Sequence, residues 1–145
     1  MGKLNLPYKE PTRLMFKSGN PKTDKNQSVE GLENIVVLHL NFAPADLSGY
    51  NVCPMASKGC KSACLHTAGN PVFQAQKDKG RSNRARFYMQ DRDKFMTQLT
   101  RELVNFVKWC DKNKKIGVVR LNTTSDISWE NYNLFIVSLW LLCGY

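Results

Sequence analysis

Residues 91–122 read DRDKFMTQLTRELVNFVKWCDKNKKIGVVRLN and contain the clearest structural signals in the chain. In residues 91–113, apolar side chains recur at helical spacing, which predicts an amphipathic helix with Asp91 as its N-cap. The recurring apolar residues are Phe95, Leu99, Leu103, Phe106, Val107 and Cys110. The β-branched run that follows, residues 115–122, predicts a buried strand. A long helix that leads into a buried strand is typical of an α/β fold.

The segments before this stretch predict the rest of an α/β unit. Residues 34–45, NIVVLHLNFAPA, form an apolar run with a proline near its end, which predicts a largely buried strand. Residues 70–90 contain helix formers and predict a helix, with Asn70 as cap and Pro71 in the first turn. The order strand, loop, helix, helix, strand implies parallel strands joined by a right-handed crossover. We therefore expect an α/β fold, a partial parallel sheet or partial barrel with helices, which would be incomplete at the C-terminus.

The chain divides into three regions. Residues 1–33 are expected to be an N-terminal arm and loop, because much of this region is polar and rich in turn residues. Residues 34–133 are expected to form a single α/β domain, with a cysteine-rich loop at residues 51–70. Residues 134–145 form an atypical apolar tail, which would either pack as a core helix or leave an exposed apolar end.

Composition favours a globular protein with a basic surface. The chain has 145 residues, of which 42% are hydrophobic and 23% are charged, as expected for one globular domain. It has no recognisable export signal and no apolar run long enough to span a membrane, so we expect a cytoplasmic protein without a membrane partner. The net charge is +9, and residues 58–115 carry fourteen Lys and Arg against five Asp and Glu. Such a zone suits nucleic acid or an anionic small molecule, although a solvated surface is the alternative.

The cysteine-rich loop is the strongest candidate for a metal site. Cys53, Cys60, Cys64 and His66 lie within fourteen residues. Three thiolates and an imidazole suit zinc or an iron–sulfur cluster, and Cys60 and Cys64 would share one face of a helical turn. The spacing matches neither a paired zinc ribbon nor a ferredoxin, so redox-active or buried thiols are the alternative. A closed Cys₃His site would be structural zinc, whereas an open position on a three-cysteine cluster would leave room for a reacting ligand.

A basic run precedes the long helix. Lys77, Arg81, Arg84 and Arg86 lie within the helix predicted at residues 70–90, and the first three share a face. Arginine binds phosphate bidentately, so these four residues are candidates for phosphate binding. The alternative is a solvated helix face on which Asp78 and Asp91 pair with the cations.

The second predicted strand ends in polar residues. Candidates for a polar pocket are Arg120, Asn122, Ser125 and Glu130, and Asp126 is the candidate catalytic residue. In parallel α/β folds, ligands bind at the carboxyl ends of the strands. Because the cysteine-rich loop follows the first strand, it should lie at the same edge of the sheet. The alternative is that Ser125 or Asp126 caps a helix that starts near Trp129.

Three motifs together resemble a family of uncharacterised bacteriophage-encoded proteins, the phage gene product 88-like family. They are CPMASKGCKSAC at residues 53–64, ARFYMQDRDKF at residues 85–95 and RLNTTSDISWE at residues 120–130. The resemblance covers about residues 10–133 and carries no established activity. It implies a metal or iron–sulfur site at the three cysteines, a polar strand end that includes Trp129, and a location in the host cytoplasm. Family members generally continue further, so the resemblance implies that this chain is a truncated member whose residues 134–145 depart from the family.

Three functions remain open at this point. The protein could be an enzyme with an open three-cysteine cluster and Asp126. It could instead be a nucleic-acid-binding module with a structural metal, in which Arg81, Arg84 and Arg86 contact phosphates. It could also be an inactive fragment. The sequence indicates neither a substrate nor an oligomeric state.

Overall fold

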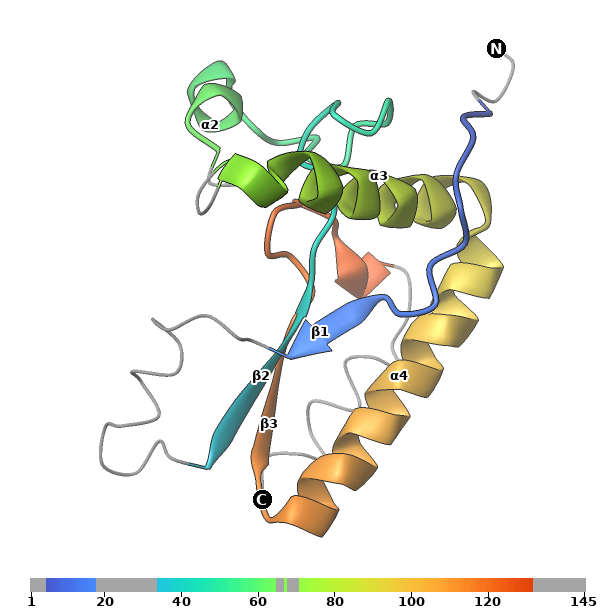
Figure 1. The fold of residues 1–145 in the computed structure, drawn as a ribbon, viewed down its shortest axis with the longest axis vertical. Helices are drawn as coiled ribbons and strands as arrows, with labels where there is room; N and C mark the ends of the chain where they lie inside the picture. The colour runs from blue at the N-terminus through green and yellow to red at the C-terminus, as the bar shows by residue number, and fades with distance from the viewer. Residues whose placement is uncertain (1–4, 18–33, 65–66, 68–70, 132–145) are drawn as a thin grey trace.

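A computed structural model gives the fold and describes residues 5–17, 34–64, 67 and 71–131. Its sheet has three strands in the order β1 (Met15–Lys17), β2 (Ile35–Leu40), β3 (Ile116–Arg120). β1 pairs with β2 antiparallel, whereas β2 and β3 are parallel, with Val37 opposite Val118. Figure 1 shows α4 (Arg92–Asn113) running beside this sheet and α3 (Gln74–Gln90) lying across its end. The expected α/β fold with a partial parallel sheet is confirmed.

Both helices that the sequence predicts are present. α3 follows a short 3-10 turn, η2 (Pro71–Phe73), and α4 packs its apolar stripe inward, so that Phe95, Leu99 and Leu103 are buried. The prediction that Asp91 is the N-cap residue of α4 is confirmed, although its side chain makes no capping hydrogen bond. Asp91 occupies the cap position, but its carboxylate accepts a hydrogen bond from the Tyr8 hydroxyl instead. The predicted cap Asn70 lies outside the described residues.

The second predicted strand is less buried than expected. β3 lies at the edge of the sheet, with the side chains of Ile116 and Val118 53% and 37% exposed. α4 packs closely against this strand because residue 117 is glycine. A Cβ atom there would lie 2.8 Å from the Cys110 sulfur and 2.9 Å from a ring carbon of Phe106. The strand is covered by α4 on one face only, which explains why it is less buried than the predicted buried strand.

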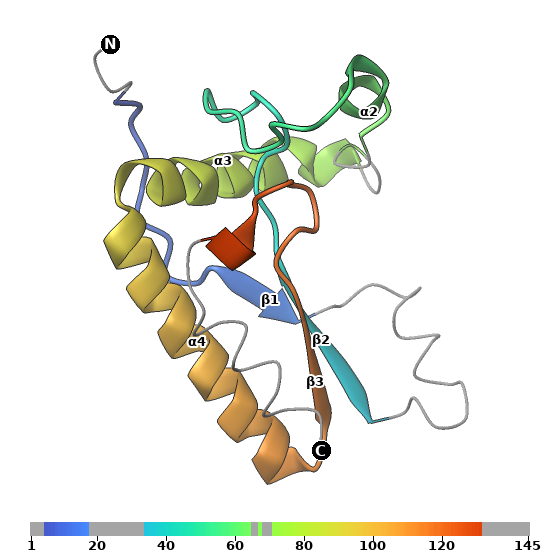
Figure 2. The same ribbon diagram turned by 180° about the vertical axis from the view of Figure 1, so that it is seen from behind.

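The N-terminal region contributes to the fold, which the sequence did not indicate. β1 lies within the region expected to be an arm and loop, and Leu14 and Met15 are fully buried. The two opposite views in Figures 1 and 2 place residues 5–17 on one face of the molecule, against both long helices. The apolar tail at residues 134–145 lies outside the described residues.

The core is centred on aromatic rings where the helices meet the ends of the strands. Phe42, just after β2, lies 5.5 Å from Tyr88, 5.7 Å from Phe95 and 6.3 Å from Trp129, measured between ring centroids. Trp129 begins the 3-10 turn η3 (Trp129–Asn131), which lies below α3 and beside the first turns of α4 in Figure 2. This cluster fixes the loops that follow both parallel strands.

Candidate functional site

The loops after β2 and β3 lie side by side at one edge of the sheet. The Asp126 backbone N–H donates to the Val52 carbonyl at 2.9 Å, and the Thr124 hydroxyl donates to the Phe42 carbonyl at 2.7 Å. Parallel pairing of β2 and β3 brings both carboxyl ends to this edge. The cysteine-rich loop therefore meets the polar strand end, as the sequence predicted.

Cys53 lies at the junction of these two loops. Its side chain is buried, with the residue only 8% exposed. The Ala45 backbone N–H donates to the Cys53 sulfur at 3.3 Å, and the thiol donates to the Thr124 carbonyl at 3.7 Å. The thiol thus contacts the segments that follow both parallel strands.

The pKa of the Cys53 thiol depends on its burial and on the groups near it. Burial raises its pKa, and the hydrogen bond from Ala45 lowers it. The negative charges of Cys64, Asp126 and Cys60 raise the same pKa further. These neighbours therefore add to the effect of burial on the Cys53 thiol, and the hydrogen bond from the Asp126 N–H to the Val52 carbonyl holds Asp126 next to this loop.

The other two cysteines lie on and just after a short helix, α2 (Lys58–Ser62). The Ser57 side chain caps this helix by accepting from the Cys60 N–H at 3.1 Å. Cys60 is exposed and Cys64 is half-buried. No residue of α2 is buried, and the ion pair between Lys61 and Asp46, at 3.1 Å, is largely exposed. Such a pair contributes only about 0–1 kcal/mol, so α2 is weakly held against the domain.

The predicted ligands do not form a ready-made metal cage. Within the described ranges, no group of three or more His, Cys, Asp and Glu side chains is placed to hold a metal ion. The predicted fourth ligand, His66, lies outside those ranges. The structure thus brings the three cysteines to one region without bringing them to ligand distance.

Asn122 organises the loop after β3. Its side-chain oxygen accepts from the Ser125 hydroxyl at 2.9 Å, from the Trp129 indole N–H at 2.9 Å and from the Ile127 N–H at 3.2 Å. Its amide nitrogen donates to the Ile127 carbonyl at 2.8 Å. Two of the predicted pocket residues, Asn122 and Ser125, therefore shape the loop. The Ser125 hydroxyl donates to Asn122, and among the described residues it accepts no hydrogen bond from the turn at Trp129, so Ser125 does not cap that turn.

We expect Asn122→Ala to lower the free energy of unfolding by about 1–3 kcal/mol, because it leaves the Trp129 indole N–H and the Ile127 backbone N–H without their acceptor. Urea denaturation followed by tryptophan fluorescence measures this change. Ser125→Ala is the matched control, since it removes one exposed hydrogen bond and should cost much less. Equal stability of Asn122→Ala and the unmodified protein would contradict the assigned role.

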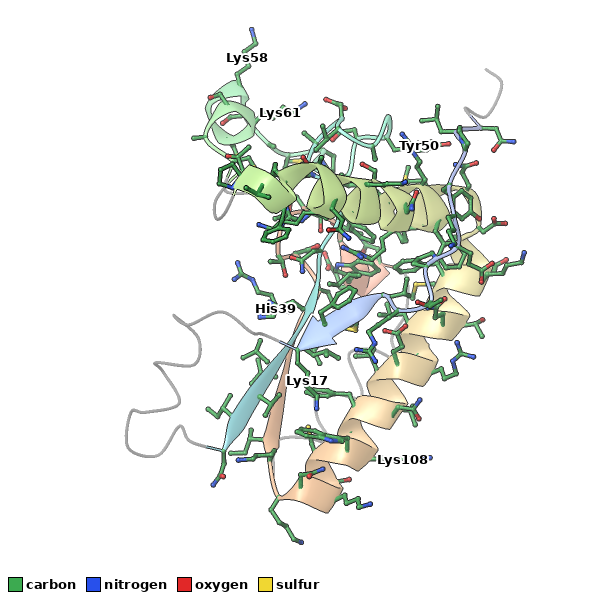
Figure 3. The ribbon with its side chains drawn as sticks, viewed as in Figure 1. Lys17, His39, Tyr50, Lys58, Lys61 and Lys108 are labelled. Carbon is green, nitrogen blue, oxygen red and sulfur yellow. The ribbon has the colours of Figure 1, made fainter. Side chains whose placement is uncertain are left out.

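The remaining polar residues at this edge are more open. Asp126, Glu130 and Arg120 are exposed. His39, which the sequence analysis did not single out, is paired across the strands with Arg120 and lies near the carboxyl end of β2 in Figure 3. Its Nδ1 lies 3.5 Å from the Thr123 hydroxyl, and burial and the Arg120 charge lower its pKa. Only the register of β2 against β3 reveals this pairing.

The predicted phosphate-binding residues Lys77 and Arg81 lie near the start of α3, half-buried. Arg81 lies 3.8 Å from the Asp78 carboxylate. The alternative to phosphate binding is a solvated helix face, in which Asp78 pairs with a cation. The contact between Arg81 and Asp78 is such a pair.

Arg84 and Arg86 make contacts within the fold. The Arg84 Nε donates to the Asn41 carbonyl at 2.8 Å. The Arg86 Nε donates to the Ser48 carbonyl and its Nη1 to the Pro7 carbonyl, both at 2.8 Å. The two arginines therefore fasten the loop after β2 and the N-terminal segment to α3. Phosphate binding by the four basic residues stays a prediction.

None of the helices in the described residues has the length and hydropathy needed to cross a membrane.

Comparison with known proteins identifies a family. The family model described as Gene product 88 matches residues 14–141. The match includes β1 and reaches into the apolar tail, so it extends past residue 133, where the resemblance was expected to end, and gives no support to a truncated member. Searches of curated proteins and of solved structures found no significant match. Because the family match covers most of the chain, the protein belongs to the Gene product 88 family, a phage gene product family of unknown function.

Proposed function

We propose that the protein binds a metal centre, either zinc or an iron–sulfur cluster, through Cys53, Cys60 and Cys64. The observation that carries this proposal is the position of the Cys53 thiol, which lies at the junction of the two strand-end loops, in the same cysteine-rich loop as Cys60 and Cys64. Thiolates are soft ligands that suit both kinds of centre.

The donor chemistry fits such a centre, but the cysteines must first come together. Since no described group of three ligands is ready to hold a metal, α2 has to close toward Cys53. That movement would cost few contacts, because no residue of α2 is buried and the ion pair between Lys61 and Asp46 is exposed. The apparent free energy of binding structural zinc is about 10–16 kcal/mol in small peptides, far more than this contact contributes.

A bound metal cation would also favour the deprotonated form of Cys53. Burial and neighbouring negative charges hold the pKa of this thiol above its ordinary value. A metal ion inverts this effect, because it stabilises the thiolate that coordinates it. The buried thiol among acidic neighbours is therefore better suited to a metal-bound state than to a free thiolate.

The identity of the metal would indicate whether the site is structural or enzymatic. A closed zinc site would hold the two loops together. A three-cysteine iron–sulfur cluster with an open position would leave room for a reacting ligand, and Asp126 would then be the candidate catalytic residue, since it is exposed beside Cys53.

The experiment is anaerobic purification of the full chain, followed by elemental analysis and an absorbance spectrum. We expect stoichiometric zinc, or iron with the charge-transfer absorbance of a cluster. Cys60→Ser should lose the metal without unfolding, because Cys60 is exposed. Cys110→Ala is the matched control, since Cys110 is buried beneath β3, and it should keep the metal. Metal-free protein, or Cys60→Ser with unchanged metal content, would contradict the proposal.

A further inference from the structure

The N-terminal segment forms a continuous hollowed surface with α3 and α4. One hollow of about 640 Å³ lies between β1 and α4, and a second of about 630 Å³ lies between residues 9–16 and α3. They adjoin, because Arg13 and Phe16 line both. A third hollow of about 450 Å³ continues along α3 and shares Lys9 and Asn83 with the second. We call these three adjoining hollows the basic groove.

Positive charge dominates the basic groove. Its exposed cations are Lys9, Arg13, Lys17, Lys79 and Arg101. Its carboxylates are those of Glu10 and Glu102, and the Glu102 carboxylate already accepts the Leu14 and Met15 N–H groups. In the folded protein, the cations of the N-terminal segment therefore lie beside those of the basic zone at residues 58–115.

A buried arginine lies in the wall of the second hollow. Arg84 is only 8% exposed, and its Nε is used by the Asn41 carbonyl. In the part of the chain that the structure describes, no carboxylate lies within ion-pair distance of it. Burial and the charge of Arg81 lower its pKa to about 10, against the opposite effect of the Glu102 carboxylate. A guanidinium has five N–H donors, so an anion in the hollow would supply a closer negative charge and further acceptors.

Aromatic faces accompany these cations. Phe16 is 40% exposed, and the Arg84 guanidinium lies 5.1 Å from the centre of its ring. At the other end of the groove, the Lys17 Nζ lies 3.0 Å from the centre of the Trp109 ring, on which Phe106 also stacks at 6.4 Å, so Phe16 is the ring available to a base. Aromatic rings set among cations are the combination that binds single-stranded nucleic acids, because bases stack on the rings while the cations contact phosphates.

We propose that the basic groove binds a single-stranded nucleic acid, with a phosphate at Arg84 and a base on the exposed Phe16 ring. An acidic peptide would use the cations but would not require the exposed aromatic ring. This surface is separate from the cysteine-rich loop, so the proposal does not depend on a metal. In Figure 3, Lys17 lies between the sheet and α4, whereas Lys108 points away from the sheet on the outer side of α4.

The test is fluorescence anisotropy of a labelled oligo(dT) strand titrated with the full chain. We expect affinity to fall with salt, with a log–log slope of about −0.7 for each phosphate contact. The double variant Arg13→Ala, Arg101→Ala should bind at least about tenfold more weakly and show a shallower slope. Phe16→Ala should lose about tenfold through the missing stacked base.

Lys58→Ala, Lys108→Ala is the matched control, because it removes two exposed cations that Figure 3 places away from the groove, on α2 and on the outer side of α4. It should bind like the unmodified protein. Thermal melting checks that each variant is folded, and all the substituted residues are exposed. Equal losses in both double variants, or no binding by the unmodified protein, would overturn the proposal. So would equal competition by polyglutamate, which would indicate a peptide partner, or by inorganic phosphate, which would indicate an isolated anion site.

Discussion

Phe42→Ala is expected to lower the free energy of unfolding by about 3–5 kcal/mol. Phe42 is fully buried at the centre of the aromatic cluster, in contact with Tyr88 of α3, Phe95 of α4 and Trp129 of η3. Alanine would leave a cavity between α3, α4 and η3 that these three elements would have to move together to fill. Few substitutions at a single position would weaken so many contacts between elements.

The measurement is urea denaturation monitored by circular dichroism and tryptophan fluorescence. Phe42→Leu is the control, since leucine fills much of the space and should cost less than alanine. The Phe42 carbonyl, which accepts from Thr124, is retained in both variants, so a difference between them reports packing alone. A loss below about 1 kcal/mol in Phe42→Ala would show that the cluster is not the centre of the core.

The regular elements were predictable because their signals are local. The apolar stripe of α4 repeats at helical spacing, and the runs that became β2 and β3 are β-branched, so each could be identified within a short window. The meeting of the cysteine-rich loop with the polar strand end followed from a general rule of parallel sheets. Those features needed no knowledge of distant contacts.

The missed features depend on contacts between distant parts of the sequence. β1 has only three residues, and its pairing with β2 gives no periodic signal. The exposure of β3 depends on the strand order, which the sequence does not encode locally. Arg84 and Arg86, predicted to bind phosphate, donate to backbone carbonyls 43 and 38 residues away. A basic run can be recognised in a sequence, but the acceptors that its side chains reach cannot.

The second large effect is expected for Glu102→Ala, which removes the attachment of β1 to α4. The Glu102 carboxylate accepts from the Leu14 N–H at 2.9 Å and the Met15 N–H at 2.9 Å, and from the Gln98 side chain at 3.0 Å. Leu14 and Met15 are buried, so water cannot easily replace the carboxylate. An unsatisfied buried N–H costs about 1–3 kcal/mol, and we expect a total loss of about 2–4 kcal/mol.

Hydrogen exchange distinguishes this mechanism from a general loss of stability. In Glu102→Ala, the amides of Leu14 and Met15 should exchange much faster, while amides in the middle of α4 should change only as far as global stability falls. Glu102→Gln keeps one side-chain oxygen as an acceptor and should retain part of the protection. Glu130→Ala, at an exposed carboxylate in η3, should change neither stability nor exchange. Unchanged protection of Met15 in Glu102→Ala would show that the carboxylate does not hold β1.

The same variant connects the fold to the basic groove. β1 carries Phe16 and Lys17, and Arg13 precedes it, so release of this strand would separate those side chains from Arg84 on α3 and Arg101 on α4. Glu102→Ala removes a negative charge from the groove, which by electrostatics alone should strengthen the binding of an anionic strand. We nevertheless expect weaker oligo(dT) binding, because the arrangement of cations and aromatic rings depends on β1. Tighter binding by folded Glu102→Ala would mean that charge alone, rather than a groove shaped by β1, attracts the strand.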